Sequence, residues 1–209
     1  MWYWIKTNKL IKRIFPKYVW DIQSRDSVYL TFDDGPTPEV TLWVLEQLKS
    51  YNAKATFFCI GENIQKHPEI FLKLISEGHS IGNHTYNHYN GWQTSNKKYL
   101  ENVALCQSEI NNLQSTNCNL FRPPYGKITS SQAKAISNLG YKIIMWDVLS
   151  ADFDTSISKE KCLENVLQNI VPGSIVVFHD SDKAFPNLKY VLPKILEFIK
   201  SKNWKCEKI

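Results

Sequence analysis

Two adjacent carboxylates stand out as residues that could do chemistry. Asp33 and Asp34 follow a short apolar run and enter a Gly-Pro turn. Neighbouring side chains on an extended segment point in different directions, so one carboxylate can bind a metal while the other faces a substrate or water. The alternative is an ordinary turn, since Asp-Gly-Pro is a common turn sequence, and the motif alone barely favours a site over that alternative.

Two histidines form the second group. His84 and His88 are four residues apart, and this spacing predicts that both lie on one face of a helical turn and reach a single divalent ion. Adding Asp34 gives two histidines and one carboxylate, a ligand set that leaves positions open for water and substrate. The competing interpretation is a chance spacing of surface histidines, which the pair alone does not exclude.

The elements that must position these residues alternate along the chain, because short β-rich apolar runs are separated by stretches of helical periodicity. Strands are predicted at 27–32, 55–60, 80–82, 119–122, 142–147, 174–179 and 205–209. Helices are predicted at 38–50, 68–77, 96–114, 130–139, 159–170 and 187–202. Repetition of strand and helix predicts an α/β fold with a parallel sheet or barrel, and a site at the carboxyl ends of its strands.

Polar residues follow the ends of these predicted strands. They are Asp33 and Asp34 after the first, His84 and His88 after the third, Arg122 closing the fourth, Asp147 and Asp152 at or after the fifth, and His179 ending the sixth. In a parallel barrel, these side chains are expected to converge on one rim.

Five motifs together carry a family resemblance. They are TFDDGP at 31–36, HTYNH at 84–88, FRPPYG at 121–126, WDVLSADF at 146–153 and IVVFHD at 175–180. In this order they resemble the motifs of the polysaccharide deacetylase family, which shares the NodB-homology domain and is also called carbohydrate esterase family 4. The resemblance runs from about Val28 to the end of the sequence. It implies a distorted (β/α) barrel of about seven parallel strands.

The resemblance also implies a division of labour for metal-dependent hydrolysis. Asp34, His84 and His88 would bind the metal, with zinc expected and cobalt, nickel or manganese as alternatives. Asp33 would act as the general base on the attacking water, and His179 would protonate the departing amine.

Other residues would support these steps. The backbone N–H of Tyr125, next to Pro124, would help to hold the oxyanion, and Trp92 on a rim loop would stack on a sugar or simply pack. The remaining supporting roles are those of Arg122, which would keep Asp33 charged, and Asp152, which would raise the pKa of His179. Alternatively, Arg122 is an ordinary ion-paired residue, and Asp152 is one of three nearby acids, with Asp147 and Asp154.

One motif departs from the family pattern, which usually reads Trp-Asp-Val-Asp-Ser-x-Asp-Trp. Leu149 replaces an acid and Phe153 replaces a tryptophan. Asp152 remains, so the reaction is expected to survive. Phe153 is smaller than tryptophan and narrows one aromatic wall of the expected site, so it bears on the size and identity of the substrate.

The leading functional hypothesis is removal of N-acetyl groups from glycans that contain N-acetylglucosamine, of the peptidoglycan or chitooligosaccharide type. On the same fold, the alternatives are an O-acetyl esterase or a hydrolase of a small non-sugar amide. A non-catalytic glycan-binding domain is a further alternative, against which the intact acid, base and ligand residues argue.

Composition bounds the remaining expectations. A chain of 209 residues that is 43% hydrophobic predicts one catalytic domain at 25–209, with a basic and aromatic arm at 1–24 packing on or beside it. The net charge of +5 is modest, so nucleic-acid binding is not expected, and the arm alone could make a weak membrane contact.

No signal peptide and no obligate protein partner are indicated. The expected location is the cytoplasm or the inner membrane surface, in agreement with five cysteines that form no disulfide or metal pattern.

Overall fold

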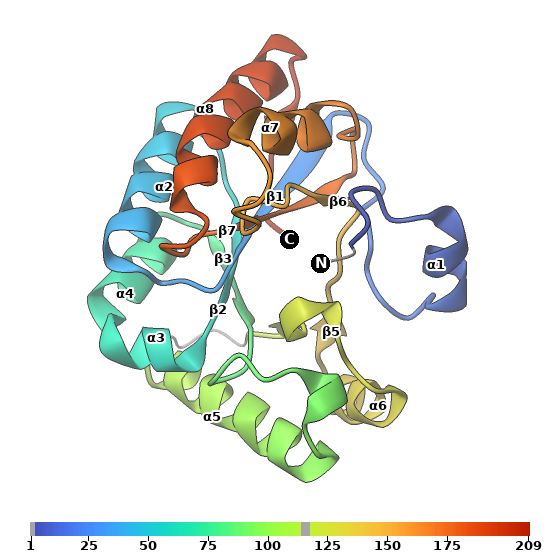
Figure 1. The fold of residues 1–209 in the computed structure, drawn as a ribbon. Coiled ribbons are helices and arrows are strands. Elements are labelled where there is room, and N and C mark those ends of the chain that lie inside the picture. The colour runs from blue at the N-terminus through green and yellow to red at the C-terminus, as the bar shows by residue number, and fades with distance from the viewer. Residues whose placement is uncertain (1–2, 114–117) are drawn as a thin grey trace.

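A single curled, parallel β-sheet organises the protein, for which the computed structural model describes residues 3–113 and 118–209. Seven strands follow one another across the sheet in the order β5-β4-β3-β2-β1-β7-β6, and β8 pairs with β1. Their bounds are β1 Ser27–Asp33, β2 Thr56–Cys59, β3 Ser80–Asn83, β4 Leu120–Phe121, β5 Lys142–Ile143, β6 Val148–Leu149, β7 Ile175–His179 and β8 Lys205–Cys206. The sheet forms a half-barrel with helices around its outer side (Figure 1), which confirms the predicted fold class.

Helices connect the strands, as the periodicity predicted. The α-helices are α1 Lys9–Ile14, α2 Pro38–Ser50, α3 Gly61–Lys66, α4 Pro68–Ser76, α5 Asn96–Leu113, α6 Ser130–Asn138, α7 Lys159–Leu167 and α8 Phe185–Ser201. Two 3-10 helices, η1 Gly91–Gln93 and η2 Pro124–Gly126, lie in loops. The short helices α1 and α3 were not predicted, and the last residue of the helix predicted at 96–114 lies outside the described residues. Among the helices of the described ranges, none is long and apolar enough to cross a bilayer.

The centre of the sheet fixes the strand register. Phe32 of β1 stacks between Phe57 of β2, at a ring-centroid distance of 5.1 Å, and Phe178 of β7, at 5.8 Å. All three rings are buried, so a one-residue slip of any of these strands would expose one of them. The same register pairs Asp33 with His179, which brings the predicted base and acid to the ends of neighbouring strands.

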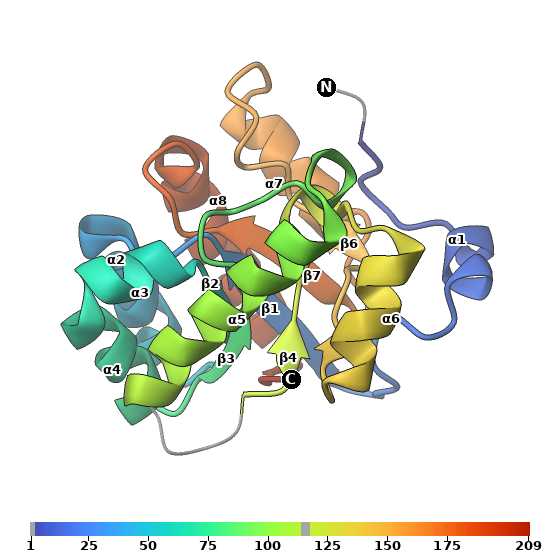
Figure 2. The same cartoon turned by 90° about the horizontal axis from the view of Figure 1, so that it is seen from below.

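The prediction of a single strand at 142–147 is wrong, because β5 ends at Ile143 and the next strand, β6, begins after this stretch at the other edge of the sheet. β5 pairs with β4, whereas β6 begins only at Val148 and pairs with β7. The N-terminal segment, residues 3–24, lies between them. Val19 donates to the Ile143 carbonyl and accepts from the Met145 N–H, at 2.9 and 2.7 Å. After β5, the edge strand beside β4, the chain therefore contacts the N-terminal segment and then enters β6 at the other edge of the sheet (Figure 2).

Asp147 lies at the opposite end of the sheet from the predicted rim. β6 pairs Val148 with Val176, so Asp147 is next to the start of β7, where Ser174 Oγ donates to it at 2.6 Å. Lys6 and Lys12 of the N-terminal segment each place Nζ 2.6 Å from its carboxylate. The expectation that Asp147 converges on the rim was wrong, because it precedes β6 instead of following it.

Candidate active site at the carboxyl ends of the strands

A cavity of about 370 Å³ opens where the central strands end. Its lining includes most of the residues predicted to carry chemistry, namely Asp33, Asp34, His84, His88, Tyr125 and His179. They come from β1, the loop after β3, the loop after β4 and the end of β7. These six residues, up to 146 positions apart in the sequence, therefore share one cavity, as expected for the carboxyl ends of parallel strands.

The three predicted metal ligands meet at one corner of this cavity. Asp34 Oδ1 lies 3.7 Å from His84 Nε2 and 3.3 Å from His88 Nε2. Two ligand atoms bound tetrahedrally to one zinc ion would be separated by about 3.3 Å, so these distances fit a shared ion. Asp34 Oδ1 is also buried and has no hydrogen-bond partner among the described residues. An orphaned carboxylate oxygen beside two imidazole nitrogens is a donor set that suits a divalent cation.

Hydrogen bonds orient both imidazole rings toward Asp34. His84 Nδ1 lies 2.7 Å from the Arg122 carbonyl, which can only accept, so Nδ1 carries the proton and Nε2 keeps its lone pair. His88 Nδ1 lies 3.1 Å from the hydroxyl of Tyr125. Burial lowers the pKa of both histidines, which favours the neutral form that binds metals.

The histidines do not lie on a helical turn, and this prediction is wrong. Thr85 and His88 both have left-handed backbone angles, with φ of 63° and 56°. The Asn83 side chain accepts from the Thr85 N–H at 2.9 Å, and the Asn102 side chain of α5 accepts from two further N–H groups of the loop. Because these N–H groups bind Asn83 and Asn102 and not carbonyls of the preceding helical turn, the segment stays a loop, and this loop brings His84 and His88 together.

Asp33 is held by a fully buried arginine. Arg122 Nη1 lies 2.7 Å from Asp33 Oδ1 and also donates to Thr31 Oγ1 at 2.7 Å. The guanidinium carbon lies 4.1 Å from the centre of the Phe58 ring. Burial lowers the pKa of Arg122, and the Asp33 charge opposes that effect. The pair thus fixes one carboxylate oxygen of Asp33 while the residue still lines the cavity.

His179 is held in the same way by a buried carboxylate. Asp152 Oδ1 lies 2.8 Å from His179 Nδ1, and Asp152 Oδ2 accepts from the His179 N–H at 2.8 Å. Burial alone would lower the pKa of His179, but the charge and the hydrogen bond of Asp152 raise it to about 9. Nε2 is the ring nitrogen left for the cavity, on a group that is protonated at neutral pH.

The remaining predicted residues differ in how close they come to the cavity. Tyr125 lines it in a left-handed conformation, with φ of 60°, whereas Pro124 is buried behind it and is not part of the lining. Trp92 is 66% exposed and also lies outside the lining, with Nε1 donating to the Ile128 carbonyl at 3.2 Å. Lys127, which does line the cavity, places Nζ 5.4 Å from the Trp92 ring centre.

Both departures from the family pattern line the cavity. Leu149 contributes an aliphatic surface, and the Phe153 ring meets the His179 ring edge-on at 4.9 Å. Tyr3, Lys127, Ser181 and Lys183 also line the cavity and were not singled out from the sequence. Trp146 of the fourth motif lines it so close to Gly126 that a Cβ on this glycine would collide with the Trp146 ring. An aromatic cluster near the N-terminus was the one signal for Tyr3, and no spacing relates it to the other site residues.

Asp180 supports the turn that presents the two carboxylates. It is buried, accepts from the Gly35 N–H at 3.0 Å, and receives the Thr41 hydroxyl at 2.6 Å. A Cβ on Gly35 would collide with the Asp180 carboxylate, so this close approach requires glycine. Burial raises the pKa of Asp180 to about 8.

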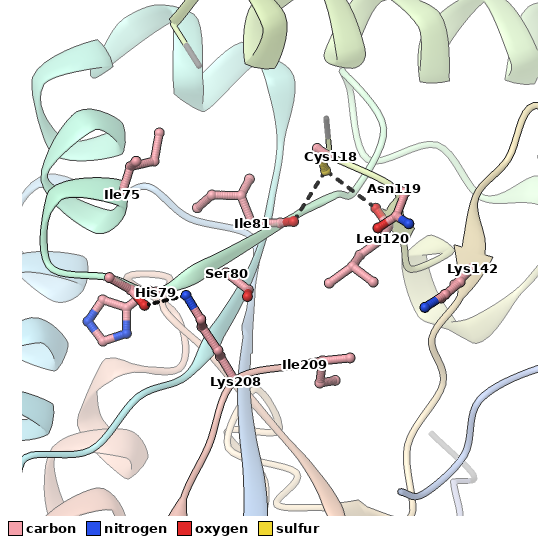
Figure 3. Close-up of a pocket in the computed structure, with 11 residues that line it drawn as sticks. Ile75, His79, Ser80, Ile81, Cys118, Asn119, Leu120, Lys142, Lys208 and Ile209 are labelled. Carbon is pink, nitrogen blue, oxygen red and sulfur yellow. Dashed lines mark hydrogen bonds between the residues drawn. The ribbon is translucent and has the colours of Figure 1, made fainter. Parts of the chain in front are cut away.

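A second cavity, of about 490 Å³, opens at the amino ends of the strands (Figure 3). Lys142, Lys208, His79 and Cys118 are the charged or titratable side chains of its lining, and no aspartate or glutamate is among the described residues that form it. It offers no general base beside a ligand set, so the chemistry predicted from the sequence maps to the carboxyl-end cavity.

Comparisons with known proteins agree with this geometry. Residues 21–144 match the family described as Polysaccharide deacetylase. A peptidoglycan-N-acetylglucosamine deacetylase of Bacillus cereus is 36% identical over 79% of this chain, which spans 64% of that relative. Another from the same species is 34% identical over 89% of this chain and 88% of its own length. A chitooligosaccharide deacetylase of Azorhizobium caulinodans is 33% identical over 76% of this chain and 75% of its own length.

A solved structure is similar over nearly the whole chain. The peptidoglycan N-acetylglucosamine deacetylase Bc1960 superposes with a TM-score of 0.89 and is 32% identical, covering 97% of this chain and 95% of that one. The fold of this chain is thus shared with that protein over 97% of its residues.

Proposed function

Because the chain belongs to the polysaccharide deacetylase family, we propose that it is a metal-dependent hydrolase that removes N-acetyl groups from glycans containing N-acetylglucosamine. Relatives named for peptidoglycan and for chitooligosaccharide support this substrate class. The observation that carries the proposal is the orphaned Asp34 Oδ1 beside His84 and His88, in a cavity that also presents Asp33 and His179.

The first step uses Asp33 and the three proposed metal ligands. A divalent ion held by Asp34, His84 and His88 would polarise the acetyl carbonyl and acidify a water molecule. Asp33 takes the proton of the attacking water, and the Arg122 ion pair holds its carboxylate in place. Separate carboxylates thus serve the metal and the proton, as the adjacent pair in the sequence suggested.

The second step uses His179. Its Nε2 donates a proton to the departing amine, while Asp152 holds Nδ1 and the backbone N–H. A pKa of about 9 keeps the ring protonated until it is needed. The backbone N–H of Tyr125, in the left-handed loop that lines the cavity, supplies an oxyanion donor.

Acetate release from a panel of N-acetylated oligosaccharides tests the proposal. We expect release from oligomers of N-acetylglucosamine or from peptidoglycan fragments, its loss with a chelator, and its recovery on adding zinc or cobalt. No acetate from any substrate at saturating zinc or cobalt would refute the proposed function.

An ester substrate tests the role of His179 separately. An alcohol leaves more readily than an amine and needs less help from an acid. We expect His179→Ala to lose N-deacetylation while it keeps hydrolysis of a matched O-acetyl ester. An equal loss of both activities would show that His179 is not the proton donor to the amine.

A further inference from the structure

Tyr3 lines the same cavity as Asp34 and His179, although it lies far in the sequence from every motif that carries the site. Its ring meets the Phe153 ring edge-on, at a centroid distance of 5.6 Å and an interplanar angle of 67°. The Phe153 ring in turn meets His179 at 4.9 Å and 72°. These three rings form a continuous wall that runs from the N-terminal segment to the predicted acid.

Tyr3 is held on the side of its hydroxyl. Its Oη donates to Asp154 Oδ2 at 2.8 Å. Asp154 also accepts from the Ser156 hydroxyl at 2.6 Å, and hydrogen bonds from Ser156 and Tyr3 lower the pKa of Asp154 to about 2. The acceptor is therefore ionised at neutral pH, which strengthens the bond that positions the ring.

The backbone behind Tyr3 is held as well. The Leu149 N–H donates to the Ile5 carbonyl at 2.9 Å, and the Thr7 N–H donates to the Asp147 carbonyl at 2.9 Å. Lys6 places Nζ 2.6 Å from the buried Asp147 carboxylate. The segment thus follows β6 from its amino end to the cavity, so Tyr3 reaches the wall on a fixed backbone.

The order of the rings indicates what Tyr3 contacts. The sugar that carries the acetyl group must lie against His179, which Phe153 adjoins directly. Tyr3 lies beyond Phe153, one ring further from the reacting atoms. Sugar rings present C–H faces that pack on aromatic rings, and a ring at this distance fits a neighbouring sugar of the same glycan.

We propose that Tyr3 is a specificity-determining residue that packs against the sugar next to the acetylated one, so that the N-terminal segment forms part of the glycan site. The inference rests on the proposed deacetylase function and adds to it a preference for oligomers. It requires that the contribution of Tyr3 appears in the binding of long substrates and not in the chemical step.

Steady-state kinetics of Tyr3→Ala and Tyr3→Phe test this inference on two substrates, a tetramer of N-acetylglucosamine and a small aryl acetate. Loss of one aromatic contact is worth a factor of about five, so we expect Tyr3→Ala to raise KM for the tetramer about fivefold. Its kcat, and hydrolysis of the aryl acetate, are expected to stay unchanged. Tyr3→Phe keeps the ring but loses the Asp154 bond, so its KM should lie between those of the wild type and Tyr3→Ala.

Phe15→Ala provides the matched control. Phe15 lies on the same segment, is 41% exposed and is not part of the cavity lining. Its removal deletes an aromatic ring without touching the wall, so KM for the tetramer should match that of the wild type.

Two results would overturn the inference while leaving the deacetylase function intact. One is an unchanged KM for the tetramer in Tyr3→Ala. The other is an equal loss of tetramer and aryl acetate hydrolysis, which would mean that Tyr3 acts by holding Phe153 and His179. If the wild type releases no acetate, the proposed function fails, and calorimetric binding of the intact tetramer decides the inference. Weaker binding by Tyr3→Ala then supports it, and equal binding overturns it.

Discussion

Strand β3 has a buried histidine at each end, and the two have different surroundings. His79 precedes the strand, accepts the Ala55 N–H on Nδ1 at 3.2 Å, and contributes to the amino-end cavity (Figure 3). His84 follows the strand, bonds the Arg122 carbonyl through Nδ1, and turns Nε2 toward Asp34. Burial lowers the pKa of both, to about 4 for His79.

The carboxylates make the difference between these two ends. Asp33 and Asp34 lie at the carboxyl end of β1, beside the loop that carries His84, whereas the described lining of the amino-end cavity has no acidic side chain. A buried histidine is therefore a structural hydrogen-bond partner at one end and a candidate ligand at the other. The direction of the strands in a parallel sheet separates these roles, because the functional loops follow the strands at one end only.

Exchange of each histidine for alanine gives the sharpest contrast between the two ends. We expect His84→Ala to lose stoichiometric metal and to lower acetate release by more than about 10²-fold, since removal of outer-shell partners alone costs 10- to 100-fold. His79→Ala should keep both, because His79 lies at the other end of the strand. Elemental analysis after dialysis and an acetate assay measure the two effects. Retention of metal by His84→Ala would contradict the assignment.

Two ion pairs, one fully buried and one with an exposed lysine, extend the comparison to stability. Arg122→Met leaves Asp33 buried without its partner, so we expect a loss of about 3–5 kcal/mol in the free energy of unfolding. Lys6 is 38% exposed, and Asp147 keeps Lys12 when Lys6 is removed, so Lys6→Met should cost about 0–1 kcal/mol. Urea denaturation of both variants measures the difference. Equal losses in the free energy of unfolding would mean that burial does not make the Arg122–Asp33 pair more important for stability than the Lys6–Asp147 pair.

The pH dependence of kcat tests why His179 and His79 have opposite pKa shifts. His179 must be protonated to act as an acid, so wild-type activity should fall as the pH rises through about 9. In Asp152→Asn the largest opposition to burial is removed, while Asp33 and Asp34 still raise the pKa of His179, so this alkaline limb should move to lower pH.

Asp147→Asn is the control for that shift. Asp147 lies at the amino end beside Ser174, so its removal should leave the limb in place. An alkaline limb at the same pH in Asp152→Asn would mean that another group controls it.

Local sequence was sufficient for the parts of the fold that depend on periodicity. Helix α2 has the predicted bounds, and the strands β1, β2 and β7 lie within two residues of theirs. The strand prediction at 142–147 failed because the apolar run continues beyond Ile143, where β5 ends. β5 pairs with β4, whereas the next strand, β6, pairs with β7 on the other side of the N-terminal segment. Strand pairing is a property of neighbours that are distant in sequence, so a local pattern does not reveal where one strand ends and another begins.

The candidate site divides along the same line. Positions after predicted strands, together with the resemblance of ordered motifs, predicted Asp33, Asp34, His84, His88 and His179 as site residues, and the structure brings them to one cavity. Only the tertiary structure decided that a loop, and not a helical turn, joins the histidines, and that Tyr3 reaches the cavity while Asp147 lies at the other end. Those outcomes depend on which side chains bind the loop N–H groups and on how the N-terminal segment crosses the sheet. Both are set by contacts between residues that are far apart in the chain.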